Sequence, residues 1–143
     1  MGMEKYDVQV EITTHQETHD KQVENYHRKF TGQLVNKGEA TYIRYREEDG
    51  TRVMFKLVTD DQVMLTRTTG QHRTALQFDT TATKVTNHYH TPYGMIELVT
   101  RTTRLDHVLD LTKQPQGHLA IDYRLYQGIS LLGEYKIRLQ FKA

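Results

Sequence analysis

Apolar and polar residues alternate with a period of two through nearly the whole chain. Near the end, Tyr135, Ile137 and Leu139 alternate with charged or polar residues. This period places successive side chains on opposite faces of a β-strand. The same pattern recurs in segments 8–13, 30–34, 43–46, 53–57, 63–68, 76–78, 85–89, 96–102, 119–125 and 135–141. It predicts about nine or ten strands at the spacing of β-sandwiches and β-barrels.

Short turns join most of these segments. Asp49-Gly50 is a strong hairpin signal, because both residues accept a positive φ at low cost. Asn36 to Gly38 and Asp60-Asp61 also reverse the chain. Hairpins between consecutive strands produce an up-and-down meander, which closes most simply into a barrel. The expected fold is therefore all-β, a closed antiparallel up-and-down barrel of about 8–10 strands, formed by a single domain spanning residues 1–143.

One segment departs from the strand pattern. Residues from His15 to Arg28 are rich in Gln, Glu, His and Lys. Their polarity makes this the only segment compatible with a helix, although its apolar content is low for one that packs on a core.

Composition narrows the function. The formal net charge is only +1, with both signs interspersed, so we expect neither nucleic acid nor a membrane surface as a partner. Cysteine is absent, which removes disulfides and thiolate chemistry and fits a cytoplasmic location. Residues Met1 to Asp7 contain no apolar segment of a secretion signal. Glycine-rich phosphate loops and nucleophile motifs are missing as well, so we expect no cofactor and assign no catalytic residue.

Histidine is the residue type that most invites a test for metal binding. His88 and His90 are two residues apart on one predicted strand and share a face. Cupin-type barrels chelate metals through such a pair together with a nearby glutamate. Here the next acid is Glu97, beyond the turn from Thr91 to Gly94. We therefore expect a solvent-facing pair and no metal site.

Arg67 is the strongest candidate for a binding residue. It lies an even number of positions after Val63 and Leu65 along the strand, so the alternating pattern places all three side chains on the face directed into the barrel. An unpaired guanidinium in a dry interior costs several kcal/mol, so Arg67 needs an anion. That anion is either an Asp or Glu of the protein or the polar group of a ligand.

The same alternating pattern places further polar side chains inside the barrel: Tyr45, Tyr89, Thr100, Thr102 and Tyr123. With Arg67 they would give an apolar cavity a few directional polar groups, as in small-molecule sites. Barrels of about eight strands can instead be filled by side chains. A solid barrel in which these groups satisfy one another remains the alternative and carries the greater weight.

Several segments also occur in a recognisable order: Val63 to Arg67 followed by Thr69-Gly70, Tyr89 to Gly94, Thr100, Leu119 to Tyr123, and Gly133 to Tyr135. Together they resemble the YwiB-like family, a domain of unknown function from Firmicutes bacteria. The resemblance covers about Val8 to Phe141. It implies a calycin, or lipocalin-like, barrel and a bacterial cytoplasmic protein. The family offers no agreed catalytic residues to transfer.

Three hypotheses follow. The leading one is non-catalytic binding of a small amphipathic or anionic ligand inside the barrel by Arg67, Tyr45, Tyr89, Thr100 and Tyr123. The second is a structural or interaction module, a homodimer that uses the outward Tyr42, Met54 and Met64. The third is an enzyme at the barrel mouth with His72, His88 or His90 as a general base.

Overall fold

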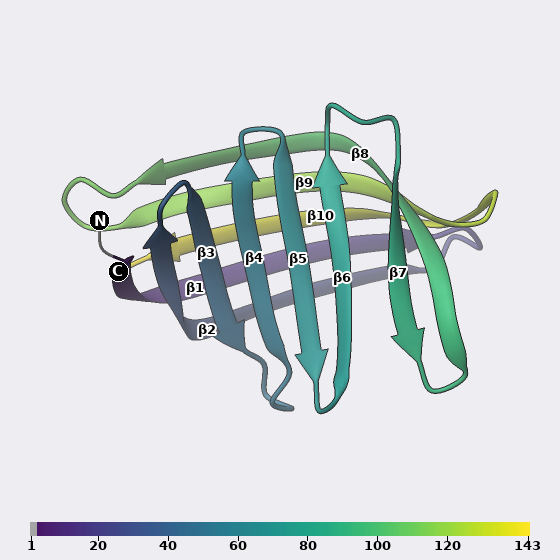
Figure 1. The fold of residues 1–143 in the computed structure, drawn as a ribbon, viewed down its shortest axis with the longest axis horizontal. Helices are drawn as coiled ribbons and strands as arrows, with labels where there is room; N and C mark the ends of the chain where they lie inside the picture. The colour runs from purple at the N-terminus through teal and green to yellow at the C-terminus, as the bar shows by residue number, and fades with distance from the viewer. Residues whose placement is uncertain (1–2) are drawn as a thin grey trace.

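The computed structural model describes residues 3–143, so the first two residues of the segment inspected for a secretion signal lie outside the described residues. Ten strands build the fold (Figure 1): β1 (Met3–Thr18), β2 (Val23–Lys37), β3 (Ala40–Arg46), β4 (Arg52–Thr59), β5 (Gln62–Thr69), β6 (His72–Asp79), β7 (Val85–Thr91), β8 (Gly94–Asp110), β9 (Gln116–Gln127) and β10 (Ser130–Lys142). Residues 3–143 contain no helix, and the predicted all-β class is confirmed. None of their elements is a helix able to span a membrane.

All ten strands belong to one antiparallel sheet, in the order β6-β5-β4-β3-β2-β1-β10-β9-β8-β7. Consecutive strands pair as hairpins except β6 and β7, which lie at the two ends of the sheet, and β1 also pairs with β10, which joins the two halves. In Figure 1, β3 to β6 cross in front of the long strands β1, β2, β8, β9 and β10. The result is the nearly closed, lipocalin-like up-and-down barrel expected from the sequence.

The barrel core consists of the inward residues of the alternating pattern. On β4, Val53, Phe55 and Leu57 are at most 3% exposed, and on β10 the same holds for Leu139 and Phe141. Burial of each such side chain contributes about 1.5–3 kcal/mol relative to exposure. Parity therefore identified the core correctly on these strands.

The segment from His15 to Arg28 is not helical. It forms the far end of the β1–β2 hairpin, where His15 pairs with Asn25 and Glu17 pairs with Val23. Pairing between β2 and β3 begins only at Gly32, so the segment before it lacks a neighbour on that side. Because this segment covers little of the core, it has no apolar face, and its sequence does not show the alternation of apolar and polar residues.

The barrel closes at a seam between β6 and β7, where side chains replace the missing backbone ladder. Asn87 accepts a hydrogen bond from the Gln77 backbone N–H through Oδ1 (2.8 Å). Thr100 donates its hydroxyl to the Gln77 carbonyl at 2.7 Å. Asn87 Nδ2 also donates to the carbonyl of Leu98 (3.1 Å). Asn87 and Thr100 thus satisfy both backbone groups that Gln77 turns toward the seam.

Candidate functional site

A cavity of 380 Å³ lies at the end of the barrel near the β3–β4 turn. Buried apolar side chains of the core close its inner part, among them Ile12, Phe55 and Ile137. Val53 and Leu65 add to this apolar part. The remaining lining residues are polar or aromatic: Thr14, His15, Gln16, Glu24, Tyr26, Tyr45, Glu47, Arg67, Tyr123, Tyr135 and Lys136. An apolar pocket with a few polar groups, within the size range of ligand sites, is what small molecules commonly occupy.

Tyrosines form much of the cavity wall. The rings of Tyr123 and Tyr135 stack with centroids 5.0 Å apart, and Tyr45 stacks on Phe30 at 4.8 Å. Burial raises the pKa of both Tyr45 and Tyr123 far above its ordinary value, and in Tyr45 the nearby Glu47 carboxylate adds to the effect. Both phenols therefore remain neutral at physiological pH and can donate or accept hydrogen bonds.

The anion that neutralises Arg67 is a carboxylate of the protein. Arg67 Nη2 donates to Glu47 Oε1 in an ion pair. The Arg67 side chain is 51% exposed, whereas that of Glu47 is 15% exposed. Tyr26 donates to the other carboxylate oxygen at 3.4 Å. As expected, Arg67 lies on the inward face of its strand. It lies at the solvent-exposed end of the barrel, however, and not in a dry interior.

The structure brings three of the five predicted site residues together in the cavity: Tyr45, Arg67 and Tyr123. Tyr89 lies beside them, partly buried against the same core. Burial raises the pKa of Tyr89, while a hydrogen bond with Thr74 and the charge of Arg67 lower it. Thr100 is not among the cavity lining, because its hydroxyl is used at the seam.

Sequence reasoning missed Glu47 as a member of this site. The sequence did contain a signal for it, since Glu47 lies two residues after Tyr45 and would therefore point to the same face of an extended strand. It was hidden because the alternation was followed only to the end of the predicted strand. The end of β3 at Arg46 leaves the Glu47 side chain directed toward Arg67.

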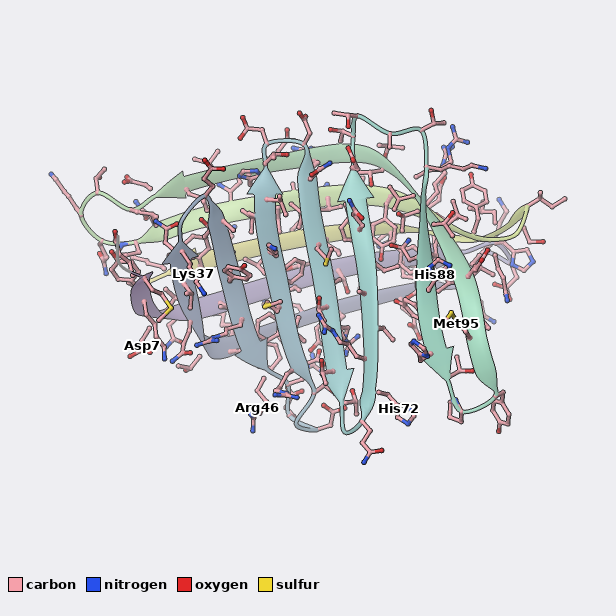
Figure 2. The ribbon with its side chains drawn as sticks, in the orientation of Figure 1. Asp7, Lys37, Arg46, His72, His88 and Met95 are labelled. Atoms are coloured by element: carbon pink, nitrogen blue, oxygen red, sulfur yellow. The ribbon has the colours of Figure 1, made fainter. Side chains whose placement is uncertain are left out.

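The histidines of the enzyme hypothesis lie apart from this cavity. His72 stands at the β5–β6 turn and His88 on β7, and both are exposed (Figure 2). His88 Nε2 is 3.4 Å from Glu97 Oε1, and His90 is exposed as well. Within residues 3–143, no three His, Asp or Glu side chains converge in a way that could hold a metal ion.

The residues of the dimer hypothesis lie on the outer face of the barrel. Tyr42, Met54 and Met64 are each half-buried there. The ammonium group of Lys56 lies 5.6 Å from the centroid of the Tyr42 ring. Neighbouring side chains of the same face thus already cover part of this apolar surface.

Comparison with known proteins agrees with this architecture. A family model described as a domain of unknown function (DUF1934) matches residues 10–139, so the chain belongs to that family. The structure is similar to the crystal structure of the ywiB protein from Bacillus subtilis, with a TM-score of 0.80 over 99% of this chain and 94% of that chain. The two are 20% identical in sequence, so the similarity establishes the fold alone. No curated protein matches significantly. The resemblance to the YwiB-like family is thereby confirmed.

Proposed function

We propose that this member of the DUF1934 family binds a small amphipathic ligand, without catalysis, in the cavity at the end of its barrel. One observation carries the proposal: a cavity of 380 Å³ that joins a buried apolar interior to a rim of polar side chains. Other inward side chains of the barrel form the buried core cluster. Tyr42, Met54 and Met64, the outward residues of the dimer hypothesis, do not line this cavity.

The lining indicates the chemistry of the ligand. Because Glu47 already neutralises Arg67, the ligand does not have to supply a counter-charge. The stacked rings of Tyr123 and Tyr135 suit a planar apolar body. Arg67 and Lys136 at the rim can hold a polar or weakly anionic end group near solvent.

The proposal can be tested with the amphipathic dye anilinonaphthalene sulfonate, titrated into the protein by calorimetry. Thr14 lines the cavity, whereas its neighbour Thr13 is exposed on the other face of β1. We expect one dye molecule per chain. Thr14→Trp, which fills the cavity, should weaken binding by at least about tenfold, and Thr13→Trp should leave it unchanged.

Native mass spectrometry of protein isolated from its source cells provides a second measurement, independent of the dye. A retained small molecule that Thr14→Trp excludes would support the proposal. Dye binding that Thr13→Trp and Thr14→Trp reduce equally would overturn it. So would a protein that binds neither the dye nor a cellular molecule.

A further inference from the structure

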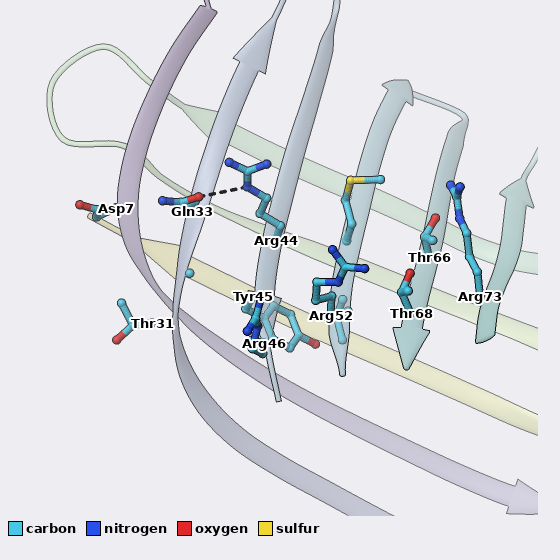
Figure 3. A pocket seen from close by; sticks show the side chains of 13 residues that line it. Asp7, Thr31, Gln33, Arg44, Tyr45, Arg46, Arg52, Thr66, Thr68 and Arg73 are labelled. Atoms are coloured by element: carbon cyan, nitrogen blue, oxygen red, sulfur yellow. Dashed lines mark hydrogen bonds between the residues drawn. The ribbon is translucent and has the colours of Figure 1, made fainter. Parts of the chain in front are cut away.

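A row of arginines crosses the outer face of β3 to β6. Arg46 on β3 lies directly opposite Arg52 on β4, Arg52 lies opposite Thr68 on β5, and Thr68 lies opposite Arg73 on β6. Since neighbouring strands are about 4.8 Å apart, the backbone positions of the row span roughly 14 Å. Figure 3 shows these side chains on the outside of the sheet, with Arg44 beside them.

The charges of this row are not compensated within the described chain. Among residues 3–143, the ion pairs involve other arginines or histidines, and no carboxylate oxygen lies within 4.0 Å of the side-chain nitrogens of Arg44, Arg46, Arg52 or Arg73. Arg44 donates only to the neutral side chain of Gln33, at 3.1 Å. Like charges directly opposite each other destabilise a sheet. Arg46 and Arg52 are such a pair.

These arginines surround a groove of 710 Å³. Asp7, at its β1 side, is the only acidic residue in the lining. Thr66 and Thr68 of β5 also line it, and Thr66 is 4% exposed. Within the described part of the chain, the Thr66 hydroxyl has no hydrogen-bond partner. A buried hydroxyl in this condition is rare and costly, and at the floor of the groove it is available to a ligand.

We propose that this groove binds a small ligand that carries two or more phosphate groups. Arg46 and Arg52 are close enough to share one phosphate, and guanidinium groups bind phosphate through paired hydrogen bonds. Arg73 is two strands from Arg52, roughly 10 Å away at the backbone, which suits a second phosphate. The Thr66 hydroxyl donates to a phosphate oxygen from the floor of the groove.

The bounded shape of the groove favours a small ligand over a nucleic acid strand. Its volume lies within the range of small-molecule sites, and the row ends at β6, the edge of the sheet. A nucleic acid platform would need basic and aromatic residues that continue along a longer track. The groove is also separate from the barrel cavity, although Tyr45 and Val53 contribute to the lining of both.

The experiment is a calorimetric titration of the full chain with inorganic tripolyphosphate at low salt. We expect saturable binding of one tripolyphosphate per chain. Arg52→Gln and Arg73→Gln should each weaken it by about tenfold or more, since each removes a charge-assisted contact. Thr66→Val should weaken it by a smaller factor. The matched control is Arg101→Gln, which removes an exposed arginine from β8 and should change the affinity less than about twofold.

Three results would overturn the proposal: no saturable binding of tripolyphosphate, equal losses in Arg52→Gln and Arg101→Gln, or binding of a long oligouridylate with no binding of tripolyphosphate. The last result would assign the face to nucleic acid. Thermal unfolding of each variant checks the fold. No arginine variant should be less stable than the parent, because Arg52, Arg73 and Arg101 are exposed and have no carboxylate partner in residues 3–143.

Discussion

Replacing Thr100 by valine should weaken the seam that closes the barrel. Thr100 is 1% exposed, and its hydroxyl donates to the Gln77 carbonyl at 2.7 Å. Valine has nearly the same shape, so the substitution removes the hydrogen bond without leaving a cavity. Because β7 does not pair with β6, no backbone donor from β7 is in position to replace it.

The magnitude follows from these contacts. A lost hydrogen bond costs about 1 kcal/mol, and a buried acceptor left without a partner costs about 1–3 kcal/mol. Gln77 is half-buried, so water can reach part of the site and the cost lies toward the lower end. We expect a loss of about 1.5 kcal/mol, which corresponds to a Tm lower by roughly 5 °C for a domain of this size.

Urea unfolding gives the free energy, and hydrogen exchange at the Gln77 amide reports on the seam itself. The control is Thr86→Val, because Thr86 lies on β7 but is exposed; it should change the stability by less than about 0.5 kcal/mol. Dye binding in the barrel cavity should be unaffected by Thr100→Val. If the two valine variants are equally stable, the assignment of Thr100 to the seam is refuted. If Thr100→Val loses dye binding without losing stability, Thr100 belongs to the ligand site instead.

Three further predictions concern other parts of the barrel. Arg52→Thr should stabilise the protein by up to about 1 kcal/mol in urea unfolding, because it removes the charge directly opposite Arg46; a loss of stability would contradict the repulsion. Gly32→Ala should destabilise by about 1–3 kcal/mol in the same assay, since an added Cβ would lie 2.5 Å from the Arg44 carbonyl oxygen. Hydrogen bonds from the Thr81 and Gln62 side chains lower the pKa of Asp79, so the unfolded chain binds this proton first as the pH falls. The stability that this lowered pKa contributes is complete above the ordinary carboxyl pKa and is lost in more acidic solution. In Asp79→Asn, the midpoint of urea unfolding should therefore fall less steeply below about pH 4 than in the parent. An unchanged slope would argue against this role of Asp79.

The sequence was most informative where a strand has one dry face. Val53, Phe55 and Leu57 could be assigned to the core by parity alone, because the barrel interior is apolar and the outer face is wet. The hairpin from His15 to Arg28 was not predictable in this way. Both of its faces are polar, and its strand conformation depends on pairing along β1 with residues far away in the chain.

The candidate site shows a second limit. Parity placed Tyr45, Arg67 and Tyr123 on inward faces, and they do meet in one cavity. The alternating pattern indicates the face of a strand on which a side chain lies, but not its position along the barrel axis. It therefore could not show that Arg67 is near solvent or that Thr100 lies at the seam. Those positions depend on strand stagger, which long-range pairing sets.

The arginine row depends on the same long-range information. In the linear sequence, Arg44 and Arg46 lie far from Arg73. Cross-strand register brings Arg46, Arg52 and Arg73 into one row. Overall net charge is therefore a poor guide to the local field of this sheet.

The two groups of arginines answer different physical demands. Arg67 stands at the mouth of an apolar cavity, where an uncompensated charge would oppose folding, and Glu47 satisfies it within the protein. Arg46, Arg52 and Arg73 stand on a solvated face, where folding requires only that the residues be polar. Many neutral polar residues would meet that requirement without mutual repulsion, so the fold does not explain the choice of three guanidinium groups. A bound polyanion does, because it converts the repulsion among them into attraction shared by one ligand.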